Sequence, residues 1–207
     1  MPSDPLPLQL TCSAGVFLLH GDYEYLSEGY YAAVEVELHG LTALPSCADV
    51  LDAYNVPVAL ERVRQAGLPV PEWYLTNDTV KPPAVIYGVH PFARAFRVVY
   101  EPQEAWIAAR QLSRQGKYLL CYQRLPVHAR LIEVELILDR TPETAYAWWA
   151  EQLYGLFHLP LAKLRLIETP DGQTFFSALE RLPRSRLSTK SRKLLQERLQ
   201  AFCARRG

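Results

Sequence analysis

Hydrophobic and polar positions follow two different periods along the chain, which predicts a mixture of strands and helices. Residues 8–19 are apolar and β-branched, and this favours a strand that is interrupted at Gly15. In residues 23–39 apolar side chains recur every four positions, which indicates a helix that ends at Gly40. Part of that segment also alternates like a strand, but the glycine that follows it favours the helix. A short extended piece is expected at residues 41–45.

The rest of the chain continues this mixture. Three further helices are expected, at residues 55–67, at residues 102–116 and from a cap at Thr141 onward. The expected buried face of the last of these is Ala145, Trp149, Leu153 and Leu156. Strands are expected at residues 73–75, 84–87, 96–100, 118–123, 129–138, 161–168 and 174–179. Helices and strands are intermixed, so the fold class is α/β or α+β, with mixed sheets and packed helices.

The composition is that of a globular cytoplasmic protein. The 207 residues suffice for one domain or for two small lobes, and 49% of them are apolar and 21% charged. No apolar run approaches the ~18–20 residues that span a bilayer, and the first residues lack the basic stretch of a secretory signal. The four cysteines lie far apart without a metal-binding spacing, which indicates reduced thiols of the cytoplasm.

The charge is unevenly distributed although it sums to zero. Residues 181–207 hold nine basic residues and one acid, Glu197, so the rest of the chain carries about −8. A final helix, capped by Ser188, has an apolar face that favours folding back on the protein, and this face consists of Leu195, Leu199 and Phe202. The zero net charge argues against nucleic acid as a partner. The candidate anion-binding residues of this basic tail are Arg184, Arg186, Lys190, Arg192 and Lys193.

Motifs of nucleotide, metal and nucleophile chemistry are missing from the sequence. No two of the ten glycines lie closer than six residues, which excludes a phosphate-binding loop. The five histidines form no pair at a spacing of three or four, so no two could bind one metal from a single helix turn. Glu133 and Glu135 share one face of a strand, which acid–base chemistry could use, but a solvated strand face is the favoured interpretation.

A tyrosine-rich segment is the most distinctive local feature. Four tyrosines surround Ser27 and Gly29 within nine residues. Buried tyrosine hydroxyls need hydrogen-bond partners, so the segment forms either a pocket wall or the edge of a core. The binding residues expected here, for a partner or a peptide, are Tyr23, Tyr25, Ser27, Gly29, Tyr30, Tyr31 and Glu37.

The same segment resembles a known family. The run from Tyr25 to Tyr31, followed by residues 37–40 and by Pro45 and Ser46, resembles the signature of the RimK-like ATP-grasp N-terminal domain. Residues 153–161 resemble a second segment of that family. The resemblance implies a domain that usually precedes an ATP-grasp ligase domain and takes part in peptide modification.

The middle of the chain also resembles an ATP-grasp domain, from residue 55 onward. In that family a lysine touches the nucleotide phosphates, and a late Asp and a Glu-x-Asn motif hold Mg²⁺. The matching positions here are Tyr87, Arg165 and residues 178–180, so the resemblance implies that the metal site is lost. Lys81 and Lys117 are the candidate phosphate contacts if nucleotide still binds.

Three functions are compatible with these features. The chain ends at Gly207 without a ligase domain, so the favoured interpretation is a stand-alone accessory or peptide-recognition protein, non-catalytic and without cofactor. Its expected partner is a separate ATP-grasp ligase or a short peptide. One alternative is a small degenerate ATP-grasp enzyme that binds ATP and Mg²⁺, and another is an anion or RNA binder that uses the basic tail. The expected organisation is one domain over residues 1–207, with sub-lobes at 1–46 and 47–207.

Overall fold

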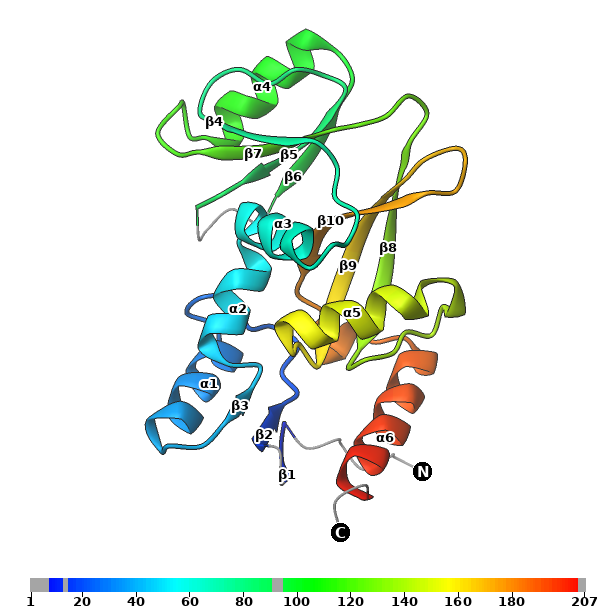
Figure 1. Ribbon diagram of the computed structural model, residues 1–207. Helices are drawn as coiled ribbons and strands as arrows, with labels where there is room; N and C mark the ends of the chain where they lie inside the picture. Colours follow the sequence, from blue (N-terminus) through cyan, green and yellow to red (C-terminus); the bar gives the residue numbers. More distant parts are fainter. Residues whose placement is uncertain (1–7, 13–14, 91–94, 205–207) are drawn as a thin grey trace. The chain divides into compact units, whose positions relative to one another are not determined.

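The computed structural model describes residues 8–12, 15–90 and 95–204, and side chains as far as residue 201. The chain divides into two compact units (Figure 1). Unit 1 comprises Met1–Tyr54, Val134–Leu164 and Leu179–Gly207, and unit 2 comprises Asn55–Glu133 and Arg165–Ala178. The division into sub-lobes at residues 1–46 and 47–207 stays a prediction.

Unit 1 begins with a small sheet and two helices. Strands β1 (Gln9–Cys12) and β2 (Gly15–Leu18) pair antiparallel, and β3 (Ala43–Leu44) pairs parallel with β2. Helix α1 (Glu28–Leu38) confirms the helical interpretation of that segment, and the chain leaves it through Gly40 at φ +72°. Helix α2 (Cys47–Tyr54) was not expected from the sequence.

The helix expected from Thr141 begins later than its cap predicted. The Thr141 hydroxyl accepts a hydrogen bond from the Glu143 backbone N–H (3.2 Å), so it closes a local turn instead of capping a helix. A 3-10 turn (Thr144–Tyr146) then leads into helix α5 (Ala147–Phe157). Ala145 is exposed and Leu156 only half-buried. The buried residues of α5 are Trp149, Ala150, Leu153 and Phe157.

Helix α6 (Thr189–Ala204) closes unit 1 and follows a 3-10 turn at Arg184–Arg186. The Ser188 hydroxyl accepts from the Ser191 backbone N–H (3.2 Å), which confirms Ser188 as its cap. Leu195 and Leu199 are buried in one cluster with residues from β2, β8 and β9, so the helix folds back as its apolar stripe predicted. The side chain of Phe202 lies outside the described residues.

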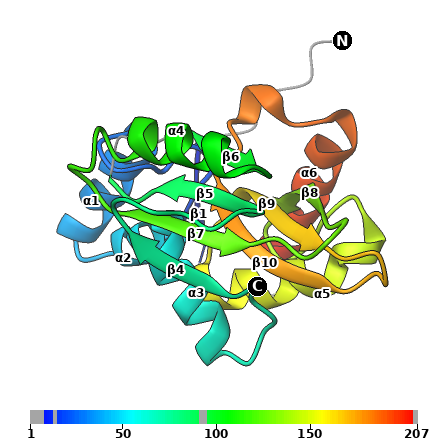
Figure 2. The ribbon, with the colours of Figure 1, turned by 90° about the horizontal axis from the view of Figure 1, so that it is seen from above.

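Unit 2 is built on a four-stranded antiparallel sheet with the order β4-β7-β5-β6. Its strands are β4 (Trp73–Thr76), β5 (Ala84–Gly88), β6 (Phe96–Val99) and β7 (Leu120–Arg124). Helix α3 (Val56–Gln65) precedes the sheet, and α4 (Pro102–Leu112) runs along it in Figure 2. Alanines on the buried side of α4 pack against β5 and β6, which forms the core of this unit.

Helix α4 ends four residues before the expected glycine stop at Gly116. Arg114 and Gln115 adopt φ values of +50° and +64°, which a continuing helix cannot use. The Ser113 hydroxyl accepts from the Gly116 backbone N–H (2.8 Å) and stabilises the turn.

A third sheet has the order β10-β9-β8 and consists of β8 (Arg130–Ile137), β9 (Leu161–Glu168) and β10 (Thr174–Glu180). The unit boundaries fall inside these three strands, at residues 133–134, 164–165 and 178–179. A polar cluster, described below, is formed by Tyr87, Gln123 and the parts of these strands that belong to unit 2. The intermixed strands and helices confirm the expected α/β class.

Candidate functional site

The tyrosine-rich segment forms the entry to α1. Ser27 is the helix cap: its hydroxyl accepts from the Tyr30 backbone N–H (3.2 Å) and donates to the Asp22 carbonyl (3.0 Å). Gly29 is buried against the same carbonyl, and a Cβ at this position would lie 2.3 Å from the Asp22 oxygen. The Ser-x-Gly part of the motif therefore fixes the geometry of the helix entry.

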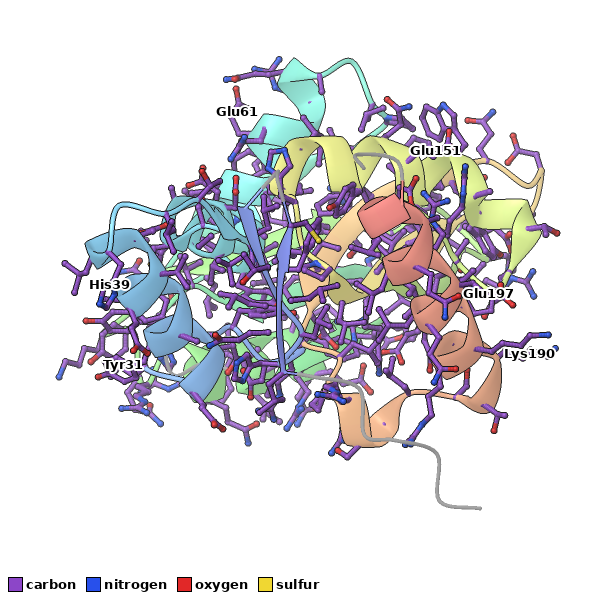
Figure 3. The ribbon with its side chains drawn as sticks, turned by 90° about the horizontal axis from the view of Figure 1, so that it is seen from below. Tyr31, His39, Glu61, Glu151, Lys190 and Glu197 are labelled. Atoms are coloured by element: carbon purple, nitrogen blue, oxygen red, sulfur yellow. The ribbon has the colours of Figure 1, made fainter. Side chains whose placement is uncertain are left out.

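The four tyrosines of the segment divide into one core residue and three at the surface. Tyr23 is fully buried and donates its hydroxyl to the Leu18 carbonyl (2.6 Å), so it is a core residue and not part of a binding surface. Burial raises the pKa of Tyr23, which keeps its hydroxyl protonated. Tyr25, Tyr30 and Tyr31 form a chain of edge-to-face contacts with centroid distances of 5.3 and 6.2 Å. Tyr31 is 56% exposed and lies on the outer face of α1 (Figure 3). We call Tyr25, Tyr30 and Tyr31 the tyrosine face.

Glu37 links the end of α1 to the start of α2. Its carboxylate accepts from the Cys47 backbone N–H (2.8 Å). Desolvation raises the pKa of the Cys47 thiol to about 11, and the hydrogen bond and negative charge of Glu37 add to this effect. Ser46 and Asp49 exchange reciprocal hydrogen bonds that cap α2. Asp49 also lies 3.3 Å from the His158 ring nitrogen, so the two segments that carry the family resemblance meet here.

A pocket of about 450 Å³ opens in unit 1 beside the start of α1. Residues after β2, the first turn of α1 and the 3-10 turn before α6 line it, and they include His20, Asp22, Glu28, Gly29, Arg184 and Ser185. Two residues expected from separate arguments, Gly29 of the tyrosine-rich segment and Arg184 of the basic tail, thus line one pocket. His20 and Asp22 were not expected, and the only local signal was Gly21, a glycine directly after an apolar strand.

Unit 2 holds a buried polar cluster at the positions that the ATP-grasp resemblance assigns to nucleotide and metal. The Tyr87 hydroxyl lies 2.8 Å from the Ser177 hydroxyl, which in turn donates to Gln123 (2.7 Å). Arg165 is 1% exposed and donates to Glu133 (2.7 Å) and, at 3.5 Å, to the Tyr87 hydroxyl. Its guanidinium also lies 3.6 Å from the centre of the Phe96 ring.

Mg²⁺ is held through carboxylates and phosphate oxygens. The position that the sequence resemblance assigns to a metal carboxylate is occupied by the guanidinium of Arg165, which donates to Glu133. The carboxylate of Glu133 is already paired with that guanidinium. Among the described residues, no group of three or more His, Cys, Asp and Glu side chains is arranged to hold a metal ion.

The two candidate phosphate contacts, Lys81 and Lys117, are both exposed. In the antiparallel pair of β5 and β7, Ala84 lies opposite Arg124 and Gly88 opposite Leu120. Lys81 precedes one end of this ladder and Lys117 precedes the other. Their role as phosphate contacts stays a prediction.

The basic tail is largely engaged with its own unit. Arg198 forms a bidentate pair with Asp139 (2.6 and 3.0 Å), and Arg181 pairs with Asp22 (3.0 Å). Of the expected anion-binding residues, Arg192 donates to the Leu187 carbonyl (3.2 Å), and Lys193 lies 3.8 Å from Glu197. Arg186 and Lys190 are exposed, the latter on the outer side of α6 (Figure 3). Arg184 alone of the five lines the pocket.

The fold is that of the ATP-grasp ligases. PsnB, an ATP-grasp ligase complexed with a phosphomimetic variant of its minimal precursor, Mg and ADP, matches at a TM-score of 0.58 and 16% identity, over 84% of this chain and 67% of that one. A RimK domain ATP-grasp protein from Sphaerobacter thermophilus DSM 20745 matches at 0.59 and 13%, over 85% and 74%. The D-alanine–D-alanine ligase from Coxiella burnetii matches at 0.58 and 13%, over 83% and 64%.

Within this class the sequence defines the family. The profile of the RimK-like ATP-grasp N-terminal domain matches residues 8–198, and the chain belongs to that family. No protein of curated function matches the sequence. Over the described ranges, no helix combines the length and apolarity that a membrane crossing requires.

Proposed function

We propose that this protein is a non-catalytic accessory or peptide-recognition domain that acts with a RimK-like ATP-grasp ligase in peptide modification. It uses no nucleotide or metal cofactor of its own. The observation that carries the proposal is the buried cluster of Tyr87, Arg165 and Ser177 in unit 2. The sequence resemblance assigns Arg165 to a metal-carboxylate position, and an arginine there supports a role in binding over one in phosphoryl transfer.

The tyrosine face is the proposed contact surface for the partner. Tyr25, which precedes α1, and Tyr31, which lies in α1, are exposed amphipathic side chains that each contact the ring of Tyr30. Exposed aromatic side chains of this kind are enriched in protein interfaces, because they offer large contact areas at a low entropic cost. PsnB, which shares the fold, is described in complex with its precursor peptide PsnA2 and AMPPNP, and this supports a peptide-bearing ligase as the partner class.

The experiment reconstitutes peptide modification from purified components. A RimK-like ligase and its substrate peptide, taken from the genome that encodes this chain, are incubated with ATP and Mg²⁺, with and without this protein. We expect the protein to increase the rate of peptide modification, measured by mass spectrometry, and to release no ADP when it is incubated alone. An unchanged rate, or ADP release by this protein alone, contradicts the proposal.

Two matched variants separate the tyrosine face from a general effect of surface tyrosines. Tyr31→Ala removes an exposed ring from the tyrosine face, and we expect it to reduce the stimulation. Tyr100→Ala removes a ring that is 61% exposed in unit 2, and we expect it to leave the stimulation unchanged. Equal effects of the two substitutions would show that the tyrosine face is not the contact surface for the partner.

A further inference from the structure

Strand β4 lies at the edge of the unit 2 sheet. It pairs with β7 on one side, and no strand of the described residues pairs with its other side. The Arg124 N–H donates to the Glu72 carbonyl (2.9 Å) at the start of this ladder. Hydrogen-bonded pairs alternate along antiparallel strands, so Tyr74 also directs its backbone N–H and C=O toward β7. By the same alternation, Trp73 and Leu75 direct theirs outward.

This outward edge of β4 is open. Over the described ranges, the backbone groups of Trp73 and Leu75 form no hydrogen bond with another segment. Tyr74 is 40% exposed and Leu75 is 48% exposed. Exposed edges are usually protected by a lysine, a proline or a bulge, and the strand Trp73–Thr76 has none of these. Such an edge is a template for one more strand.

The sequence of the edge is complementary to itself in one antiparallel register. If Trp73 lies opposite Leu75 of a second copy, and Leu75 opposite its Trp73, each pair exchanges both of its N–H···O bonds. A displacement by two residues in one direction brings Leu75 opposite Pro71, which has no N–H to donate. A displacement in the other direction brings Glu72 opposite Asp78, and like charges directly opposite are destabilising.

The side chains on both faces suit this register. Tyr74 would lie opposite Tyr74 of the second copy, in the closely spaced pair at the centre. The Tyr74 ring stacks on the Tyr122 ring at a centroid distance of 5.1 Å, so a row of tyrosines would continue from one copy to the other. On the opposite face, Trp73 would contact Leu75 of the second copy. Aromatic cross-strand pairs of both kinds stabilise antiparallel sheets.

We propose that β4 pairs antiparallel with β4 of a second copy of this chain, around a two-fold axis at Tyr74. The two unit 2 sheets join into one sheet, and the symmetric pairing closes as a dimer. Because the contact is built on a single short strand, the dimer is weak and depends on protein concentration. This surface is distinct from the tyrosine face, so the inference does not depend on the proposed function.

Sedimentation velocity of the full chain, at concentrations from about 1 to 500 µM, tests the assembly. We expect an equilibrium of monomer and dimer with a dissociation constant of about 10–100 µM. Leu75→Pro removes an outward N–H without a bond to β7, and it should raise the dissociation constant at least tenfold. A monomer at every concentration, or a dimer that Leu75→Pro leaves unchanged, overturns the proposal.

A matched pair of lysine substitutions separates the edge from a general effect of exposed apolar residues. Leu75→Lys introduces a protecting charge at the edge and should also weaken the dimer at least tenfold. Ile107→Lys is the control, because Ile107 is 43% exposed on α4, which contacts β5 and β6. It should leave the dissociation constant unchanged. Thermal unfolding establishes that each variant is folded, and equal effects of the two substitutions in folded proteins would refute the assignment to β4.

Disulfide cross-linking tests the register. Tyr74→Cys brings two thiols into the central pair, in which the Cα atoms lie about 4.5 Å apart, within the reach of a disulfide. Leu75→Cys places its thiols at diagonal positions with Cα atoms about 7–8 Å apart, beyond that reach. Under mild oxidation, Tyr74→Cys should form a covalent dimer at least tenfold faster than Leu75→Cys, as measured on non-reducing gels. The parent protein reports cross-linking through the native cysteines, and equal rates for the two variants, or rates no higher than the parent's, contradict the proposed pairing.

Discussion

Single residues of the family motif are explained by local geometry before any ligand is considered. Ser27 caps α1, Gly29 allows the helix entry to touch the Asp22 carbonyl, and Glu37 holds the first turn of α2. Each of these contacts is made by the side chain of the residue itself or, at Gly29, is possible because the residue has no side chain. The exposed residues Tyr25 and Tyr31 remain as the part of the motif that the fold itself does not require.

The close approach at Gly29 gives a first prediction. Gly29→Ala places a Cβ 2.3 Å from a backbone oxygen, which cannot move as a flexible side chain can, so we expect a loss of ~1–3 kcal/mol in the free energy of unfolding. Gly155→Ala is the matched control, because Gly155 lies in α5 with nothing within 4 Å of an added Cβ. It should stabilise the protein by ~1 kcal/mol, since alanine is the better helix former. Urea denaturation measures both, and a neutral effect of Gly29→Ala would contradict the close approach.

The thiol of Cys47 gives a prediction on pH dependence. Its pKa is raised to about 11 by desolvation and by Glu37, so at pH 8 almost all of the thiol is protonated and unreactive. The rate of alkylation by iodoacetamide should therefore rise with pH until about pH 11. Glu37→Gln removes the negative charge and lowers the pKa, so alkylation at pH 8 should accelerate by about tenfold for each unit of that decrease. Glu35→Gln, on the same helix, should not change the rate, and peptide mapping by mass spectrometry identifies the labelled cysteine.

At the scale of elements, the helices of unit 1 are held by their apolar faces and by a few directed contacts. Helix α6 buries Leu195 and Leu199, while most of its charged residues face solvent or one another. Its bidentate pair between Arg198 and Asp139 is the best-formed ionic contact of the tail. Burial of a leucine side chain stabilises the fold more than an exposed ion pair does. The apolar residues Leu195 and Leu199 therefore hold α6 in place.

The last helix can be tested by comparing one apolar and one charged substitution. Leu195 is 0% exposed, and Leu195→Ala should reduce the free energy of unfolding by ~2–5 kcal/mol and expose α6 to limited proteolysis. Lys193→Ala removes an exposed partner of a 3.8 Å pair with Glu197, and its melting temperature should barely change. A comparable loss in both variants would show that charge, and not the stripe, anchors the helix.

At the scale of the whole molecule, the chain has the ATP-grasp fold, and the expected loss of nucleotide binding is a prediction. The similarity to the ligase structures extends over 53–85% of either chain at 12–18% identity, which shows the fold and no more. The membership in the RimK-like ATP-grasp N-terminal family rests on the sequence profile over residues 8–198. Tyr87 and Arg165 are the residues at which the sequence resemblance predicts a departure from a metal-dependent ligase, and they lie 3.5 Å apart.

The absence of metal ligands at this cluster predicts the response to nucleotide. In calorimetric titrations of the full chain with ATP we expect no Mg²⁺-dependent binding, because Arg165 would repel the metal at the position where a carboxylate is needed. A RimK-like ligase titrated under the same conditions serves as the positive control. Saturable, Mg²⁺-dependent binding in the sub-millimolar range would favour the degenerate enzyme over the accessory domain.

The sequence by itself determined the features that depend on neighbouring residues. The cap at Ser188, the helical choice for α1 and the buried stripe of α6 could all be predicted, because periodicity and capping are local properties. Helix α2 was not predicted, although Ser46 and Asp49 form a capping pair, because the sequence analysis began the next helix only at residue 55 and assigned no element to residues 47–54.

Only the tertiary structure decided which distant residues meet. The pocket brings Leu8, His20 and Glu28 together with Arg184, more than 150 residues further along the chain, through backbone contacts that no local pattern encodes. The antiparallel register of β5 and β7 likewise brings Tyr87 opposite Cys121, which no local pattern predicted. Such outcomes follow from the pairing of strands and the packing of whole elements, which depend on the summed burial of many residues and not on any single segment.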